Sequence, residues 1–211
     1  MVRRIRHPIF ARVYERVAPQ LEARGAAEHR DEMLEGLSGR VVEIGSGPGL
    51  NFGHYPPAVT DVVAVEPEPR LRRGSEAAAR DAPVAVTVVD GTADRVSAID
   101  EEFDAGVASL VLCSVHDQAA ALAELHRVIR SGGELRFYEH VQSSRGGLAR
   151  AQRAADAVWP WFAGGCHTSR QTERAIGDAG FEIERIRRFD FRPSVVTALV
   201  APHVVGAARR L

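Results

Sequence analysis

Residues 40–49 read Arg-Val-Val-Glu-Ile-Gly-Ser-Gly-Pro-Gly, and this stretch decides the kind of fold that the chain builds. Val41, Val42 and Ile44 form a β-branched apolar run, which predicts a buried strand. Glycine then follows at every second position. Alternating glycines after a strand predict a tight turn at which a ligand can approach the backbone closely. We therefore expect a strand that leads directly into a ligand-binding turn.

Two classes of cofactor bind at a turn of this kind. Dinucleotides bind the pattern G-x-G-x-x-G, whose third glycine stands at the sixth position. Here Leu50 holds that position, and the third glycine, Gly49, comes one residue earlier. The spacing G-x-G-x-G after Glu43 resembles the first motif of S-adenosylmethionine (SAM) methyltransferases, whose cofactor has no pyrophosphate. An NAD-dependent oxidoreductase and a glycine turn without a ligand remain alternatives.

Composition limits the classes of function. The chain has 211 residues, 45% of them hydrophobic, which is enough for a single domain over 1–211 with a substantial core. The formal net charge of −1 predicts no nucleic-acid partner. The basic start, residues 1–11, lacks the apolar run of a signal peptide. The sequence contains no stretch of 18 apolar residues, so we expect no transmembrane segment. We therefore expect a cytoplasmic protein.

Helices and strands alternate through the middle of the chain. Their apolar periodicity predicts strands at 41–44, 61–67, 84–90, 103–112 and 134–141, and helices at 68–80 and 117–130. Because Pro56 and Pro57 follow closely, only a very short helix fits between Leu50 and Tyr55. This alternation predicts an α/β fold with a Rossmann-like, mostly parallel sheet and helices on both faces.

Further elements are expected at both ends of the chain. Residues 8–36 read as a helix interrupted at Pro19, preceded by the basic residues Arg3, Arg4 and Arg6. After the core, 147–162 reads as a helix, and Ser169 is expected to cap a helix that ends at Asp178. The sequence then predicts a strand over 181–189 and a last strand, 203–210, at the sheet edge.

Acidic residues end the second and third predicted strands, where ligands bind in such folds. Glu66 lies 21 residues after Gly45 and can accept hydrogen bonds from both ribose hydroxyls of a nucleoside. Asp90 can accept a hydrogen bond from an adenine amino group, and Gly91 lets the chain turn beside the ring. The plainer alternatives are a surface acid and an ordinary Asp-Gly turn.

Taken together, these segments resemble the class I SAM-dependent methyltransferases. The resemblance rests on residues 43–49, Glu66, Asp90-Gly91 and the run 125–133, Leu-His-Arg-Val-Ile-Arg-Ser-Gly-Gly. It implies a seven-stranded sheet whose last strand is antiparallel, with SAM as cofactor and S-adenosylhomocysteine as product. The cofactor-binding residues that it implies are Glu43, Gly45, Ser46, Gly47, Gly49, Asn51, Glu66, Pro67, Asp90, Gly91, Thr92, Ser109 and Leu110.

A narrower set of residues resembles the alkyl thiol S-methyltransferases of animals. This set comprises Asn51-Phe-Gly-His-Tyr-Pro-Pro57, Leu110-Val-Leu-Cys-Ser-Val115, Glu139-His-Val141, Gly165-Cys166, Thr168-Ser-Arg170 and Pro202-His203. The resemblance implies methyl transfer to the sulfur of a small-molecule thiol. The animal proteins carry a hydrophobic membrane anchor at the N-terminus, whereas this chain has a basic amphipathic helix there.

A thiol must lose its proton to react well. Its free pKa is about 8.5, so only a few per cent is thiolate at neutral pH. A histidine at the carboxyl edge of the sheet can take that proton, and His140 and His116 are the catalytic candidates, with His167 as a third. The residues predicted to contact the substrate are Phe10, Tyr14, Tyr55, Cys113, Cys166 and His167.

The two cysteines, Cys113 and Cys166, show no metal-ligand spacing, so neither a metal site nor a disulfide framework is expected. Residues 1–36 are predicted to form a helical lid, 37–141 the SAM-binding core and 142–211 the substrate side. The fold and the cofactor motifs leave the acceptor atom open. A methyltransferase that acts on oxygen, nitrogen or carbon and a non-catalytic SAM-binding module therefore remain alternatives.

Overall fold

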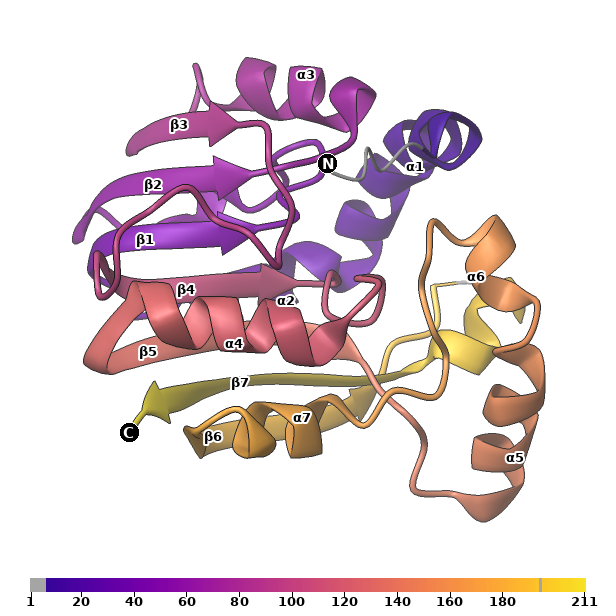
Figure 1. The fold of residues 1–211 in the computed structure, drawn as a ribbon. Coiled ribbons are helices and arrows are strands. Elements are labelled where there is room, and N and C mark those ends of the chain that lie inside the picture. Colours follow the sequence, from indigo (N-terminus) through magenta and orange to yellow (C-terminus); the bar gives the residue numbers. More distant parts are fainter. Residues whose placement is uncertain (1–6, 194) are drawn as a thin grey trace.

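One seven-stranded sheet organises the protein, in the order β3-β2-β1-β4-β5-β7-β6 (Figure 1). The computed structural model describes residues 7–193 and 195–211. The strands are β1 Gly39–Ile44, β2 Val59–Val65, β3 Ala85–Val89, β4 Phe103–Ser109, β5 Ile129–His140, β6 Phe181–Asp190 and β7 Pro202–Arg210. Neighbours from β3 to β5 run parallel, while β7 runs antiparallel to both β5 and β6. The predicted Rossmann-like architecture with an antiparallel last strand is confirmed.

Helices cover both faces of this sheet. They are α1 Pro8–Leu21, α2 Ala27–Leu34, α3 Pro69–Ala78, α4 Gln118–Val128, α5 Gly146–Ala155, α6 Trp159–Phe162 and α7 Thr172–Asp178, with 3-10 turns at Phe52–His54 and Val195–Val200 and a π-helical turn at Glu22–Ala26. Val41 of β1 packs in a core with residues of α2, whereas Val42 packs in a second core with residues of α4 and α7. Because successive side chains of a strand point to opposite faces, an apolar strand such as β1 feeds both cores.

The place of β7 in the sheet corrects one prediction. This strand lies between β5 and β6, and β6 is the edge strand. The first seven residues of β7, Pro202 to Ala208, are all buried, whereas β6 has many exposed positions. The burial of residues 202–208 agrees with the place of β7 inside the sheet, where layers cover both faces.

The N-terminal helices also differ from the prediction. The helix α1 continues through Pro19, and the chain bends at Gly25, whose φ of +111° falls within the π-helical turn. Glycine adopts such a positive φ without the steric cost of a β-carbon, so the bend forms there. The basic residues Arg3, Arg4 and Arg6 lie outside the described residues.

Other element boundaries also differ from the prediction: β5 begins at Ile129 instead of residue 134, so the helix predicted over 117–130 ends at Val128. β4 ends at Ser109 because Leu110 leaves the extended conformation, with a φ of +54°. The predicted helix 147–162 is split into α5 and α6. Ser169 does not cap α7, which begins at Thr172, because the Ser169 hydroxyl donates to Asp156 at 2.9 Å.

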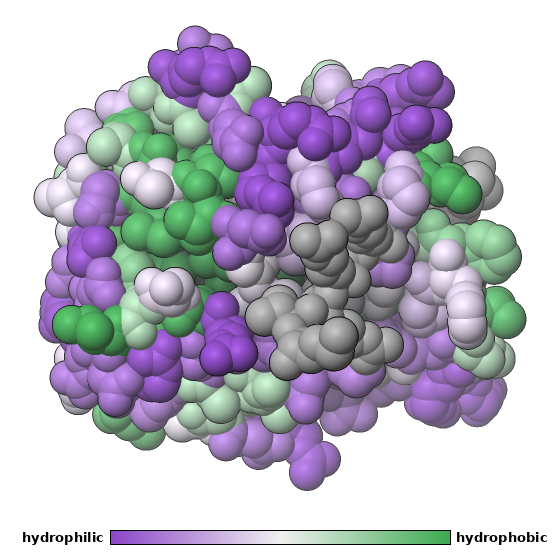
Figure 2. Space-filling view, turned by 45° about the horizontal axis from the view of Figure 1, so that its top comes forward, coloured by the Kyte–Doolittle hydropathy of each residue, from purple (hydrophilic) through white to green (hydrophobic). Residues whose placement is uncertain are grey.

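One connection leaves part of the sheet thinly covered. In the described part of the chain, the link from β3 to β4, residues 90–102, contains no helix. Figure 2 shows an apolar area on the left of the molecule, with hydrophilic residues above it. None of the described helices is both long and apolar enough to cross a membrane.

Candidate functional site

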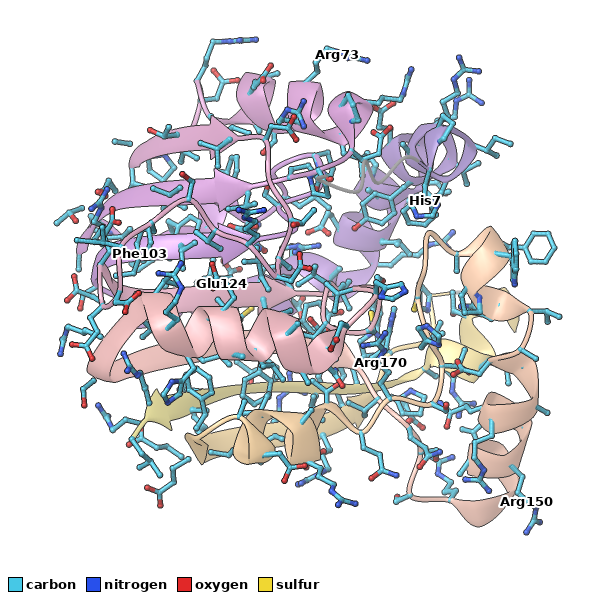
Figure 3. The ribbon with its side chains drawn as sticks, in the orientation of Figure 1. His7, Arg73, Phe103, Glu124, Arg150 and Arg170 are labelled. Carbon is cyan, nitrogen blue, oxygen red and sulfur yellow. The ribbon has the colours of Figure 1, made fainter. Side chains whose placement is uncertain are left out.

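A cavity of about 320 Å³ lies at the carboxyl ends of the central strands. Figure 3 shows His7, a cavity residue, and Arg170 toward this end of the sheet, and Phe103 at the opposite end, where β4 begins. The predicted site residues that line the cavity are Phe10, Tyr14, Glu43, Gly45, Ser46, Gly47, Asn51, Glu66, Pro67, Ser109, Leu110, His140 and Cys166. The structure therefore brings together most residues of the predicted site.

The glycine turn after β1 is fixed by hydrogen bonds to the end of β2. The backbone N–H groups of Gly45 and Ser46 donate to the Val65 carbonyl oxygen at 2.8 and 3.2 Å. Gly47 has a φ of +57°, and among the described residues other than its chain neighbours, the atom nearest to a β-carbon there would be one of the Tyr14 ring, at 3.9 Å. The backbone of Gly47 is therefore open to the cavity, as expected for a turn that a ligand approaches.

Gly49 has a different role, since it does not line the cavity. A β-carbon on Gly49 would lie 2.8 Å from the Ala78 β-carbon and 2.9 Å from the Phe52 ring. Only glycine leaves room for this approach between the turn, α3 and the 3-10 turn. The close packing thus gives one reason for a glycine at position 49, and the predicted contact of Gly49 with the cofactor stays a prediction.

Glu66 connects the end of β2 to the glycine turn. One carboxylate oxygen accepts from the Gly47 N–H and the other from the Glu68 N–H, both at 2.8 Å. Burial raises the pKa of Glu66 to about 7, against the lowering effect of these two hydrogen bonds. A carboxylate oxygen can accept more than one hydrogen bond, so Glu66 can still accept from ligand hydroxyls.

A second buried carboxylate, Glu43, holds the segment that follows the turn. Its two oxygens accept from Asn51 Nδ2 at 2.9 Å and from the Tyr55 hydroxyl at 2.6 Å. Burial raises the pKa of Glu43 to about 7. Tyr55 is thereby held in the core, and it does not line the cavity, contrary to its predicted contact with substrate.

Arg30 of α2 is a site residue that the sequence reasoning missed. It is buried, and its Nη1 donates to Asn51 Oδ1 at 2.6 Å and to the Ser109 hydroxyl at 2.9 Å. Its Nε donates to the carboxylate of Glu22 at 3.1 Å. Arg30 thus places a cation in the cavity wall and joins α2 to the ends of β1 and β4. Its position within a predicted helix, far in sequence from Ser109, gave no signal of this role.

The helix α1 forms one wall of the cavity. Phe10 and Tyr14 line it, and their rings stack with centroids 5.4 Å apart. Glu15, on the same helix, accepts a hydrogen bond from Arg70 of α3 at 2.7 Å. This ion pair ties α1 to α3 across the mouth of the glycine turn, where a lid was predicted.

Sulfur and imidazole groups meet at another corner of the cavity. His140, at the end of β5, has its Nδ1 3.4 Å from Cys166 Sγ and 3.5 Å from Cys113 Sγ. His140 and Cys166 line the cavity, whereas Cys113 lies just behind them. Contact with the Cys166 thiol and burial raise the pKa of the Cys113 thiol far above its usual value.

Several predicted site residues lie away from the cavity. The Asp90 side chain is 72% exposed and forms an ion pair with Arg72 at 2.8 Å. Asp90, Gly91 and Thr92 do not line the cavity, whereas the next residue, Ala93, does. His116 is exposed and also outside the lining. His167 lies outside it too, and its Nδ1 is 3.0 Å from the Asp156 carboxylate.

The remaining polar groups of the lining indicate a bound molecule. Among the described residues, the Tyr138 hydroxyl and Trp159 Nε1 are buried without a hydrogen-bond partner, and both residues line the cavity. Buried polar atoms are nearly always paired in native proteins, so water or a ligand is the expected partner. With a carboxylate at the end of β2 and an open glycine backbone, the residues present fit a nucleoside-containing cofactor.

Comparison with known proteins agrees with this site. A family model described as a methyltransferase domain matches residues 42–137. The chain is 34% identical to thiol S-methyltransferase TMT1B of Rattus norvegicus over 182 residues, which cover 83% of this chain and 73% of that protein. It is 31% identical to thiol S-methyltransferase TMT1A of Homo sapiens, over 82% of this chain and 72% of that protein.

Solved structures share the fold. The crystal structure of a SAM-dependent methyltransferase from Thermotoga maritima superposes with a TM-score of 0.71 and 22% identity, covering 96% of this chain and 97% of that one. Geranyl diphosphate methyltransferase in complex with SAM superposes with a TM-score of 0.67 and 17% identity, covering 90% and 89% of the two chains.

Proposed function

The chain belongs to the SAM-dependent methyltransferase family, and from this premise we propose that it transfers a methyl group from SAM to the sulfur of a small-molecule thiol. One observation carries the choice of sulfur. The segments 110–115, 139–141 and 165–166, which resemble the animal thiol S-methyltransferases, lie far apart in the sequence. In the fold they meet around Cys113, His140 and Cys166 at one corner of the cavity.

The residues of the glycine turn and of the β2 end would hold the nucleoside part of the cofactor. Bound SAM supplies a methyl group that its sulfonium already activates. Glu66 is placed to accept hydrogen bonds from ribose hydroxyls, and the open backbone at Gly47 allows close approach. Asn51 is held between Glu43 and Arg30, so its side chain faces the cavity in one orientation.

The remaining task of the protein is to align the acceptor and to exclude water. The stacked rings of Phe10 and Tyr14 and the apolar residues Ala163 and Val200 also line the cavity. Of the three histidines considered from the sequence, only His140 lines the cavity, which supports His140 as the residue that acts on the acceptor. The expected cytoplasmic location and the lack of a nucleic-acid partner stay predictions.

Turnover of a thiol and of its hydroxyl analogue, measured side by side, tests the proposal. S-adenosylhomocysteine release is followed with both acceptors across about pH 6–9, a range that brackets thiol ionisation. The thiol should react faster at every pH, and its kcat/KM should rise as the thiolate fraction rises. Faster methylation of the hydroxyl compound would refute the sulfur acceptor and favour an O-methyltransferase.

A further inference from the structure

Three potential metal ligands converge at the sulfur-bearing corner of the cavity. The ligand atoms of Cys113, His140 and Cys166 all lie within 4.8 Å of one another. They come from three different places in the fold: the turn after β4, the end of β5 and the loop after α6. The two sulfurs are 3.7 Å apart, which is far longer than the bond of about 2.05 Å in a disulfide.

The distances within this triad match one face of a zinc tetrahedron. Zinc binds sulfur at about 2.3 Å and imidazole nitrogen at about 2.0–2.1 Å. Tetrahedral angles then place two sulfurs about 3.7–3.8 Å apart and each sulfur about 3.5–3.6 Å from the nitrogen. The observed separations are 3.7 Å between the sulfurs and 3.4 and 3.5 Å between each sulfur and His140 Nδ1. These separations agree with those that a bound zinc ion would impose on its three ligands.

The backbone around the triad is fastened from several sides. The buried Glu139 carboxylate accepts from the N–H groups of Leu112 and Cys113, at 2.8 and 3.1 Å. The N–H of His167, next to Cys166, donates to the Cys113 carbonyl at 2.8 Å. A β-carbon on Gly165 would lie only 2.8 Å from the Ser114 carbonyl oxygen. The two loops that carry the cysteines are therefore locked against each other, which preorganises their sulfurs.

We propose that Cys113, His140 and Cys166 bind one zinc ion whose fourth coordination position faces the cavity and takes the sulfur of the acceptor thiol. The donor set, two thiolates and one imidazole, is one that zinc uses in catalytic sites with an open fourth position. His140 and Cys166 both line the cavity, so that position is within reach of a bound acceptor. The identity of the fourth ligand rests on the proposed thiol methyltransferase function, whereas the zinc site itself does not.

Methyl transfer at this site forms one bond to the methyl carbon and breaks one. On binding to zinc, the two cysteines and the acceptor thiol each release their proton to solvent. The bound thiolate sulfur forms a bond to the methyl carbon of SAM. The bond from that carbon to the sulfonium sulfur breaks, and its electron pair stays on S-adenosylhomocysteine. The product thioether carries no charge and binds zinc weakly, so it leaves. In this scheme His140 is a ligand through Nδ1 and not a general base.

Metal content and cobalt spectroscopy test the site without reference to activity. Reduced full-length protein, freed of metal and dialysed against zinc, should hold one zinc per chain. Cobalt(II) should give a thiolate-to-metal charge-transfer band and the visible bands of a tetrahedral site. Cys113→Ser, Cys166→Ser and His140→Ala should each weaken zinc binding by more than about 100-fold, since even changes behind the ligands cost about 10–100-fold.

A matched histidine variant controls for general damage. His126 lies on α4 and packs against Phe181, with ring centroids 5.4 Å apart, so His126→Ala should keep its zinc. Calorimetric SAM binding establishes that each ligand variant is folded. A folded wild-type protein that holds no zinc and gives no cobalt bands overturns the site. Ligand variants that keep wild-type zinc affinity overturn it as well.

Activity measurements separate this inference from the proposed function. After chelator treatment, thiol methylation should fall at least tenfold while SAM binding is unchanged, and zinc should restore the rate. Raising the pH should not rescue His140→Ala, as it would if His140 acted only as a base. Full thiol turnover by zinc-free protein refutes the acceptor thiolate as fourth ligand of the zinc and leaves the thiol methyltransferase standing. One bound zinc with faster methylation of the hydroxyl analogue refutes the thiolate as fourth ligand together with the proposed function.

Discussion

At the scale of single residues, Glu66 combines a structural and a binding role. Its carboxylate accepts hydrogen bonds from the N–H groups of Gly47 and Glu68, and the residue also lines the cavity. Glu66→Ala should therefore weaken SAM binding tenfold or more, because hydrogen bonds to a charged group contribute roughly 1.5–3 kcal/mol each. Calorimetry gives the affinity. Asp61→Ala, at the other end of β2, is the control and should bind normally, and an unchanged affinity in folded Glu66→Ala would exclude the ribose contact.

The protonation of the same carboxylate predicts how stability depends on pH. Burial raises the pKa of Glu66 from 4.5 to about 7 in the folded protein. Between these values the folded state binds more protons than the unfolded state, so the free energy of unfolding falls as pH rises. One such carboxyl accounts for about 3 kcal/mol. Urea unfolding of the ligand-free protein should show this fall, and Glu66→Gln should reduce it. An equal slope in the variant would contradict the assignment.

Residues at strand ends were predictable, and residues that act across the fold were not. Glu66 was found because its strand and its distance from Gly45 are visible in the sequence. Asp90 has the same signal, yet its side chain turns outward to Arg72, because the signal sets the strand end and not the direction of the side chain. Arg30 was missed because its partners Asn51 and Ser109 become neighbours only when α2 packs on the sheet.

At the scale of elements, α1 contributes no residue to the two hydrophobic cores of the sheet, as far as the described residues show, so its position depends on other contacts. Glu15 and Arg70 connect α1 to α3, and their side chains are 27% and 41% exposed. An exposed ion pair contributes about 0–1 kcal/mol, so Arg70→Ala should speed SAM dissociation by only a few fold. Exchanging the two charges, Glu15→Arg with Arg70→Glu, should restore the rate. Stopped-flow fluorescence measures it.

Arg130→Ala is the matched control for this ion pair. It breaks the pair between Arg130 and Asp104 at the amino end of the sheet, far from the cavity. Its dissociation rate should equal that of the wild type. A charge exchange that fails to restore the rate would show that Arg70 acts on the cofactor by another route than through α1.

Strand order is the element-scale property that the sequence predicted least well. Local periodicity located β7, but it carries no information about which strands become its neighbours. Placing β7 inside the sheet required comparing its mostly small and apolar residues with the mixed pattern of β6. The short 3-10 turn at Phe52–His54, by contrast, was predictable, because prolines 56 and 57 act locally on the backbone.

At the scale of the whole molecule, the fold and cofactor class were predictable and the sulfur cluster was not. The alternation of strands and helices and the glycine turn are local patterns that together specify a Rossmann-like sheet and its binding edge. Cys113 and Cys166 are 53 residues apart, and no spacing rule connects them. Only the folded chain brings both to His140, so the sequence-based expectation of no metal site rested on spacing alone.

The cavity also predicts how the whole protein responds to its cofactor. A ligand that binds only the folded state at 100 times its Kd stabilises it by about 2.7 kcal/mol. For a chain of this size each kcal/mol raises Tm by about 2–4 °C, so saturating SAM should raise Tm by about 5–11 °C. NAD at the same concentration should leave Tm unchanged, because Leu50 stands where its fingerprint needs the third glycine. Glu66→Ala, at the SAM concentration that saturates the wild type, should show a smaller rise, since its weaker binding lowers the ratio of ligand to Kd. Differential scanning calorimetry measures all three, and stabilisation by NAD without stabilisation by SAM would contradict the placement of the cofactor.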